Sequence, residues 1–403
     1  MRRRSNPLRP AVSQAWRVSS LLLGVLVCSS CKPSDRPTIV IGKDRFNVVL
    51  ITLDTTRADH LGCYGYSKPI TPHLDRFAEK ATLFTNAICT ASVTPVSHAS
   101  ILTGLYPYTH GLRVLHGVVE NRLPDDVLTQ AEIFRDNGYA TAAFISAFPA
   151  GKYFGLHQGF DTFNEDFVDT PRERIVAPDG TVDTGSNQRR AGETTDLALG
   201  WLAHANAPFF LWLHYFDPHD PGLLPPKQFL DRVAPPVGTK REKLRAIYDM
   251  EIQYMDHHIG RVFDYLEERD QFDQTIVVIV SDHGEGLGDH NWWTHGILYQ
   301  EQIHAPLIVR APGTPPGRRV PHLVSTVDLM PTIIELAGSD PTQLRQLDGV
   351  SLVPMIEGDT TDPQRTVYAD SVNMLTYSFS NDITDKKNEM LFCVTNGEWK
   401  YIH

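Results

Sequence analysis

The sequence predicts an α/β sandwich in which helices cover a largely parallel β-sheet. Short apolar runs rich in β-branched residues recur at 47–53, 141–145, 209–215, 275–280 and 307–309. Segments with helical periodicity separate them, at 71–80, 127–137, 194–205, 240–269 and 325–337. Continuous apolar runs are typical of strands buried on both faces, and strands that alternate with helices favour parallel pairing.

The size and charge of the chain narrow the class of protein. Its 403 residues, 41% of them hydrophobic and 21% charged, are enough for one large domain or two smaller ones. The net charge is −11, and no long run of lysine and arginine follows the first few residues, which argues against nucleic acid as a partner. The negative net charge does not exclude an anionic substrate, because helix ends and metal ions supply local positive charge.

Residues 1–31 are expected to be an export signal. Three arginines near the start precede the apolar run 21–27, which is too short for a membrane span. Small residues before Cys31 resemble a bacterial lipoprotein cleavage site and make Cys31 a candidate lipid anchor, although Cys28 stands where leucine is usual. A plain cleaved signal and an uncleaved anchor are the alternatives. All three predict a protein outside the cytoplasm, in a bacterial periplasm or anchored to its membrane, with 32–45 as a polar linker.

Candidate metal ligands lie at the ends of three predicted strands. In open α/β sheets, ligands bind beyond the carboxyl ends of the strands. A carboxylate next to an imidazole suits a divalent cation of intermediate hardness such as Zn²⁺ or Mn²⁺. The candidates are Asp54 after the first run, His214, Asp217 and His219 at the third, and Asp282, His283, Asp289, His290 and His295 after the fourth.

Some of these residues have a purely structural interpretation. Asp54 alone is as consistent with a helix cap as with a metal ligand. His214 is interpreted as a core histidine within an apolar strand, with its ring nitrogens hydrogen-bonded inside the protein. The pair Asp282-His283 is the stronger signal, because a buried strand seldom ends in a charged pair unless something binds it.

The segment 94–104 (TPVSHASILTG) predicts a helix whose start could bind an anion. Thr94 suits the cap position, Pro95 the first helical position, and His98 follows one turn later on the same face. A hydroxyl at a helix N-terminus lies where backbone N–H groups and the helix dipole attract an oxyanion. By itself this pattern is most often a plain cap, and the neighbouring segments are what make Thr94 a candidate nucleophile.

From about residue 46 onward the chain resembles the sulfatases of the alkaline phosphatase superfamily. The segments that carry the resemblance keep the family's order and spacing: 47–54 (NVVLITLD), 59–65 (DHLGCYG), 71–75 (TPHLD), 99–107 (ASILTGLYP), 281–285 (SDHGE), 298–301 (LYQE) and 327–332 (VDLMPT). The resemblance implies an alkaline-phosphatase-like sandwich with a mixed, mostly parallel sheet and helices on both faces. Residues 46–360 would form the catalytic domain and 361–403 the start of a smaller C-terminal subdomain.

That subdomain is expected to be truncated. Family members usually continue into a four-stranded sheet beside the site. Here residues 391–402, whose pattern indicates a hairpin turning at Asn396-Gly397, are followed at once by the last residue, His403.

The resemblance also implies a metal-assisted, in-line displacement at sulfur or phosphorus. Asp54, Asp282 and His283 match metal ligands of the family, and His219 matches a substrate-contacting histidine. His295 falls where many sulfatases have a substrate-binding lysine.

The departures from the family concern the nucleophile and the metal. Typical sulfatases carry Cys-x-Pro-x-Arg before the segment matched by 99–107 and oxidise its cysteine to formylglycine. A gap-free alignment puts Thr94 at the cysteine and His98 at the arginine, so no formylglycine is expected. Thr55 replaces a second metal-binding aspartate, and fewer carboxylates with more histidines favour Zn²⁺ or Mn²⁺ over Ca²⁺. A threonine nucleophile is similar to superfamily branches that act on phosphate esters, such as nucleotide pyrophosphatase/phosphodiesterases and phosphoglycerol transferases.

The sequence therefore predicts an exported, metal-dependent hydrolase that cleaves sulfate or phosphate esters. Thr94, in contact with the metal, is the expected nucleophile. His98 and His219 are expected to contact the anion, and His295 to protonate the leaving oxygen. The substrate is expected to be an anionic ester of a glycan or a phospholipid head group. The alternatives are a catalytically degenerate protein of the same fold that binds a sulfated or phosphorylated glycan, and a phospho-group transferase.

Overall fold

The computed structural model describes residues 39–42, 45–113, 122–167, 187–205, 208–219, 224–230, 237–344, 346–359, 361, 364–372 and 390–403. The predicted signal with Cys31 lies outside the described residues, as does most of the predicted linker. Within that linker, Ile39 and Ile41 are buried, and the side chain of Asn137 hydrogen-bonds to the main chain of both. In the described part of the chain, no helix combines the length and the apolar character that a membrane span requires.

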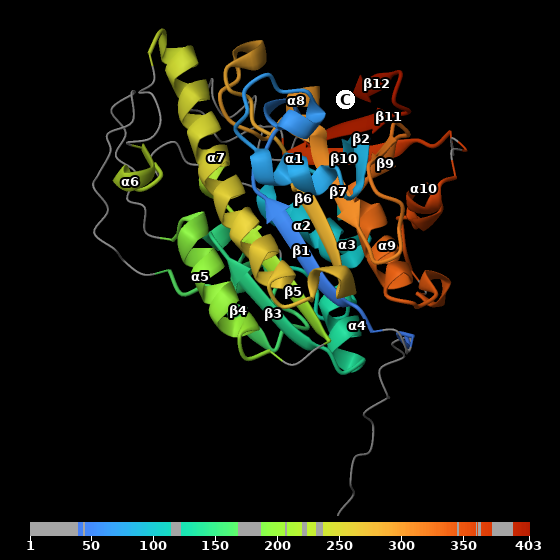
Figure 1. The fold of residues 1–403 in the computed structure, drawn as a ribbon. Coiled ribbons are helices and arrows are strands. Elements are labelled where there is room, and N and C mark those ends of the chain that lie inside the picture. The colour runs from blue at the N-terminus through green and yellow to red at the C-terminus, as the bar shows by residue number, and fades with distance from the viewer. Residues whose placement is uncertain are drawn as a thin grey trace, which may run out of the picture. The chain divides into compact units, whose positions relative to one another are not determined.

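A nine-stranded mixed sheet forms the centre of the fold (Figure 1). Its strands are β1 (Asn47–Leu53), β2 (Thr82–Ile88), β3 (Ala140–Ile145), β4 (Thr162–Asn164), β5 (Phe209–Tyr215), β6 (Thr275–Ser281), β7 (His304–Arg310), β8 (Arg318–Val320) and β9 (Val324–Ser325). They lie in the order β4-β3-β5-β1-β6-β7-β2-β8, and β9 also pairs with β2. All pairs are parallel except those of β7 with β6 and with β2. The carboxyl ends of β5 and β6 therefore flank that of β1.

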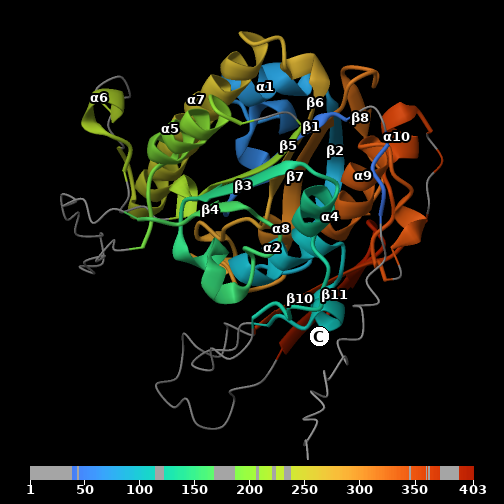
Figure 2. The same ribbon diagram turned by 90° about the horizontal axis from the view of Figure 1, so that it is seen from below.

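Helices cover both faces of the sheet (Figure 2). On one face lie α1 (Pro72–Ala78), α5 (Ala191–Leu202) and α7 (Lys240–Glu267), and on the other α2 (Thr94–Thr103), α4 (Gln130–Asp136) and α9 (Leu329–Leu336). Shorter helices are α3 (Pro107–His110), α6 (Lys227–Leu230), α8 (Gln300–Ile303) and α10 (Val353–Glu357). Successive side chains of a strand point to opposite faces. Accordingly, Val48 and Leu50 of β1 join the core beneath α2, whereas Val49 and Ile51 join the core beneath α7.

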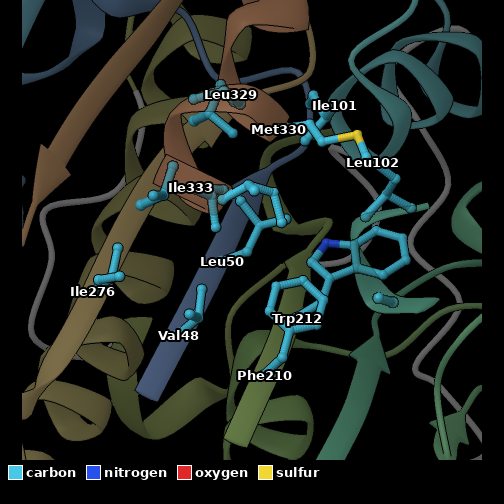
Figure 3. Close-up of a cluster of buried hydrophobic side chains, with 14 of the residues drawn as sticks. Val48, Leu50, Ile101, Leu102, Phe210, Trp212, Ile276, Leu329, Met330 and Ile333 are labelled. Carbon is cyan, nitrogen blue, oxygen red and sulfur yellow. The ribbon is translucent and has the colours of Figure 1, made fainter. Parts of the chain in front are cut away.

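Apolar packing fixes α2 against the sheet. Figure 3 shows Ile101 and Leu102 of this helix in one buried cluster with Trp212 of β5 and Met330 of α9. Full burial of each such side chain stabilises the fold by about 2 kcal/mol. Ser97, in the first turn, donates a hydrogen bond to the carbonyl of Asp282 (2.7 Å). The packing thus places the start of α2 beside the end of β6.

The strands and helices that the alternation predicts are all present, with ends shifted by a few residues. The sequence did not predict β2. Its run TLFTNAI is interrupted by the polar Thr85 and Asn86, and its register with β7 shifts between Phe84 and Ala87. Tertiary pairing with β7, β8 and β9, and not local pattern, makes this segment a strand.

A second, antiparallel sheet is built from β10 (Val367–Val372), β11 (Met390–Thr395) and β12 (Lys400–Ile402). The predicted hairpin is the β11–β12 pair, and Gly397 in its turn has a φ of 91°. Ala91 forms an isolated bridge with Asp370 of β10, and the amide of Asp370 donates to the carbonyl of Thr90 (2.8 Å). The small sheet therefore contacts the chain just before it enters α2.

Candidate functional site

The candidate site lies where the carboxyl ends of three adjacent strands meet. Asp54 follows β1, and Asp282 and His283 follow β6. One ligand atom from each of these three residues lies within 4.8 Å of the other two, and all three side chains are fully buried. The grouping that the sequence predicted at this edge of the sheet is present.

The chemistry of this cluster fits a divalent cation. Neither Asp54 Oδ1 nor Asp282 Oδ2 takes part in a hydrogen bond, although both atoms are buried. Burial raises the pKa of Asp54, and burial together with the nearby charge of Asp54 raises the pKa of Asp282. Two adjacent buried carboxylates are costly without a counter-charge. A cation between them supplies that charge, so the residues present match a metal centre.

Hydrogen bonds orient the cluster and fix the tautomers of its histidines. His283 Nδ1 donates to the carbonyl of Gly284 (3.0 Å), which leaves the lone pair of Nε2 for the cluster. His214 Nδ1 accepts the amide of Ser146 (3.2 Å), so its Nε2–H donates to Asp54 Oδ2 (3.1 Å). Burial lowers the pKa of both histidines to about 3, and both are neutral at physiological pH.

His214 was expected to be an ordinary core histidine. It is indeed buried in β5, yet it also holds one of the carboxylates of the site. Such a contact orients a ligand and tunes its basicity.

Thr94 begins α2 but does not cap it. The cap residue is Val93, so the expectation that Thr94 occupies the cap position is wrong, and Pro95 is the second helical residue. The hydroxyl of Thr94 lies 3.3 Å from His283 Nε2 and is therefore directed to the cluster and not to its own helix end. This orientation places a nucleophilic group at the candidate metal centre.

His98 does not have the position expected of an anion-contacting residue. Its Nδ1 donates to the carbonyl of Thr94 (2.8 Å), and its Nε2 accepts the hydroxyl of Thr52 (3.0 Å). Thr52 in turn accepts the indole N–H of Trp212 (3.0 Å). Because His98 is fully buried and both ring nitrogens are bonded within the protein, it anchors the start of α2 to β1 instead of meeting a substrate.

His219 and His295 form a pair beside the cluster. Their Nε2 atoms are 3.2 Å apart, and His295 Nδ1 donates to the carbonyl of Ser92 (2.9 Å). His295 Nε2 must therefore accept, and His219 Nε2 carries the shared proton. The ring of His295 is 4.5 Å from that of His283 between centroids. The structure brings both predicted residues to the site and assigns the proton to His219.

Two other candidate ligands belong elsewhere. Asp217 is buried and accepts the amide of Ala191 (2.9 Å), so it caps α5 and is not part of the cluster. Asp289 forms ion pairs with Arg57, Arg241 and Arg245. Neither carboxylate belongs to the group of ligand atoms formed by Asp54, Asp282 and His283, although one oxygen of Asp217 is buried without a hydrogen-bond partner among the described residues.

Sequence reasoning missed the groups that hold the turn after Asp54. The hydroxyl of Tyr248, from α7, bonds to the main chain of this turn. Nothing in the sequence marks this residue, because its role depends on how a helix that lies 191 to 193 residues later in the chain packs on the sheet.

Comparisons with known proteins agree with this architecture. The sulfatase family model matches residues 46–339, and the model described as N-sulphoglucosamine sulphohydrolase, C-terminal, matches residues 288–403. A sulfatase of Formosa agariphila is 27% identical over 79% of this chain and 74% of its own. An arylsulfatase of Clostridium perfringens is 26% identical over 88% of this chain and 87% of its own.

A solved structure shows the same fold. The phosphonate monoester hydrolase of Agrobacterium radiobacter has a TM-score of 0.69 at 23% identity, covering 89% of this chain and 87% of its own. The fold is thus that of the alkaline phosphatase superfamily, as the sequence predicted. With most of its length matched, the chain belongs to the sulfatase family and is a hydrolase of sulfuric or phosphoric esters.

Proposed function

We propose that this protein is a metal-dependent hydrolase that uses Thr94, and not formylglycine, as its nucleophile. The observation that carries the proposal is the Thr94 hydroxyl, 3.3 Å from His283 Nε2 and next to two buried carboxylates, each with one oxygen that has no hydrogen-bond partner in the described part of the chain. A threonine hydroxyl is a weak nucleophile until a base or a cation lowers its pKa.

The ligand set favours Zn²⁺ or Mn²⁺ over Ca²⁺. Asp54, Asp282 and His283 supply two carboxylates and one imidazole, and imidazole suits transition metals better than calcium. Held by these residues, such an ion would lower the pKa of the Thr94 hydroxyl and neutralise charge on the substrate oxygens. His214 keeps Asp54 oriented, and the neutral His283 presents its Nε2 lone pair.

His219 is the proton donor in this proposal. It holds the proton that it shares with His295, and His295 is fixed by Ser92. As the imidazolium, with a proton on each ring nitrogen, His219 would protonate the leaving oxygen from Nδ1 and return to the neutral ring, while His295 holds its Nε2–H as a positioning partner. The proton-donor role thus moves to His219, whereas the sequence suggested His295 for that role and His219 for contact with the anion.

We propose phosphate or phosphonate esters as substrates at least as good as sulfate esters. Formylglycine hydrate expels sulfate by re-forming its aldehyde, whereas a threonine ester must be attacked by water. Support comes from the relatives, which include a multifunctional alkaline phosphatase superfamily protein of Trinickia caryophylli, 26% identical over 89% of this chain and 87% of its own. Another solved relative binds D-glucosamine-2-N,6-O-disulfate as its substrate. We therefore propose an anionic ester of a glycan as the natural substrate class.

Export remains part of the proposal. Residues 1–31 would direct the chain out of the cytoplasm, with Cys31 as the lipidated residue. Mass spectrometry of the mature N-terminus tests this: a diacylglyceryl-modified Cys31 supports the anchor, and an unmodified N-terminus after cleavage elsewhere supports a plain signal.

The central experiment compares aryl sulfate, aryl phosphate and bis-aryl phosphate with Mn²⁺ or Zn²⁺ added. Thr94→Ala is expected to lower kcat by roughly 10³-fold or more on every substrate that the parent hydrolyses, as for other nucleophiles. Thr94→Ser, which keeps a hydroxyl, is expected to retain a measurable part of the activity. Sulfate hydrolysis that survives Thr94→Ala would exclude the threonine mechanism. A parent that binds a sulfated glycan but neither metal nor any hydrolysable ester would favour the degenerate binding protein.

A further inference from the structure

We propose that Tyr248 of α7 is a positioning residue for the metal centre and acts through the turn that follows Asp54. The inference rests on the proposed function, because it concerns the same cation. The two hydrogen bonds of the Tyr248 hydroxyl go to the main chain of this turn and not to Thr94 or to a carboxylate. Its hydroxyl holds the main chain of residues 55–57, which follows β1 and bonds through the amide of Thr55 to Asp282 after β6.

The turn after Asp54 has a strained backbone. Thr55 has a φ of 50°, in the left-handed region. For a β-branched residue this conformation is a genuine outlier, because the branched side chain collides with the backbone. Such strain persists only where the surroundings impose it, and it gathers at functional sites. Something must therefore hold Thr55 in place.

The strained conformation orients a metal ligand. With this φ, the amide of Thr55 donates to Asp282 Oδ1 (3.1 Å), which also accepts the amide of His283 (2.7 Å). The two bonds fix the rotation of the carboxylate and direct Oδ2, which accepts no hydrogen bond, into the cluster. If the turn loosened and the peptide between Asp54 and Thr55 rotated, the amide of Thr55 would leave Asp282 and the carboxylate would be free to turn.

Tyr248 holds the other side of this turn. Its hydroxyl donates to the carbonyl of Thr55 (2.7 Å) and accepts the amide of Arg57 (2.8 Å). The side chain is only 2% exposed, so both bonds form away from water, where losing them leaves two backbone groups unsatisfied. One hydroxyl thus satisfies a donor and an acceptor on either side of Thr56 and closes the turn.

Arg57 extends the effect to the second ligand-bearing turn. Its guanidinium donates to the carbonyl of Glu285 (3.2 Å) and pairs with Asp289 (2.8 Å), both in the segment after His283. The amide that bonds to Tyr248 is that of Arg57. Arg57 in turn links the turn after Asp54 to the turn after His283. Through Thr55 and Arg57, α7 sets the separation of Asp54 from Asp282 and His283.

The chain offers a matched control for the Tyr248 hydroxyl. Tyr64 also donates to a backbone carbonyl, that of Phe84 (2.9 Å), and accepts a backbone amide, that of Leu307 (2.7 Å). It links β2 to β7 and does not touch the cluster. Y248F and Y64F thus both remove a hydroxyl that bonds to a backbone amide and a backbone carbonyl, one at the ligand turn and one elsewhere, although the Tyr64 hydroxyl also lies 3.2 Å from the carbonyl of Leu307 and its side chain is only half-buried.

The test measures the dissociation constant for Mn²⁺ and the unfolding temperature of the metal-free protein for the parent, Y248F and Y64F. Both variants are expected to lower the unfolding temperature. Y248F alone is expected to raise the dissociation constant by roughly 10- to 100-fold, the range for lost groups that orient ligands. Its activity is expected to fall at limiting metal and to recover largely at saturating metal.

The outcomes separate this proposal from the proposed function. Mn²⁺ binding by Y248F as tight as by the parent overturns the positioning role alone. A parent that binds no Mn²⁺ overturns both proposals. If Y248F does not fold, the comparison is made in a Thr55→Gly background, where glycine takes the positive φ without strain. There Y248F still removes the hydrogen bond to the amide of Arg57, so it is expected to raise the dissociation constant by a smaller factor, and an unchanged value overturns the proposal.

Discussion

At the scale of single residues, the site is dominated by two carboxylates that the fold buries side by side. Burial raises the pKa of Asp54 in the folded protein without metal. An acid whose pKa rises on folding contributes stability at low pH and loses it as the pH rises from its unfolded value of 3.8 through the folded value. At neutral pH the metal-free fold is therefore destabilised by Asp54, and the proposed cation is expected to reverse the effect.

Asp54→Asn separates these two contributions. The amide keeps the shape and still accepts the His214 N–H, so the metal-free variant is expected to be more stable than the parent at neutral pH, by about 1–3 kcal/mol. Added Mn²⁺ is expected to raise the unfolding temperature of the parent but not of the variant. Asp217→Asn is the control, because Asp217 is equally buried and lies outside the cluster. A metal-induced rise in Asp54→Asn would contradict the ligand assignment.

The sequence predicted the candidate ligands more readily than the residues that support them. Asp54, Asp282 and His283 follow apolar runs, and the rule that parallel strands end at one edge brings them together. The role of His98 could not be predicted, because it depends on Thr52, a residue of another element whose hydroxyl the ring happens to meet. Local pattern carries no information about such contacts.

At the scale of elements, helix α2 matters most for the proposed site because it carries Thr94. Its C-terminus ends in a residue with a left-handed backbone conformation. Gly104 caps its C-terminus with a φ of 68°, a conformation that favours glycine. A Cβ at this position would also lie 2.8 Å from a methyl group of Leu347. The positive φ and the close approach of Leu347 both disfavour any residue larger than glycine at position 104.

Gly104→Ala is expected to lower the free energy of unfolding by about 1–2 kcal/mol from backbone strain, with a further loss from the contact with Leu347. Gly111→Ala is the matched control, because Gly111 also has a positive φ (77°) but no atom within 4 Å of the added Cβ. Urea unfolding of both variants isolates the packing contribution as the difference between them. Equal losses would mean that Leu347 yields without cost.

The elements that the sequence predicted are those whose hydrophobic pattern is continuous. The five predicted strands and the long helix α7 were found because burial on two faces, or one helical face, dictates their composition. The strand β2 was missed because Thr85 and Asn86 interrupt its apolar run. Its identity follows from the neighbours that pair with it, which only the folded chain supplies.

At the scale of the whole molecule, many histidines are buried in neutral form, and this makes the fold sensitive to acid. His110 is the clearest case outside the site, because it is 1% exposed, donates from Nε2 to Ser100 Oγ (3.1 Å) and accepts the amide of Leu112 at Nδ1 (3.1 Å). Burial, followed by the charge of Arg113, lowers its pKa from 6.5 to about 3. Both ring nitrogens already take part in hydrogen bonds, and Nδ1 accepts one. A second proton on Nδ1 would therefore break the bond from Leu112.

The sign of the resulting pH dependence follows from proton linkage. Above pH 6.5 His110 is neutral in both states and contributes nothing. Between pH 6.5 and about 3 the unfolded chain takes up a proton that the fold cannot, so the fold loses about 1.4 kcal/mol per pH unit through this residue.

His110→Gln keeps a donor toward Ser100 and cannot titrate. It is expected to cost about 1 kcal/mol at pH 8 through weaker hydrogen bonding, yet to flatten the decline in acid by one proton. Urea unfolding between about pH 8 and pH 4 measures both. The same substitution at the exposed His204 is the control and should keep the parent's slope. A parental slope in His110→Gln would show that other groups take up the protons on unfolding.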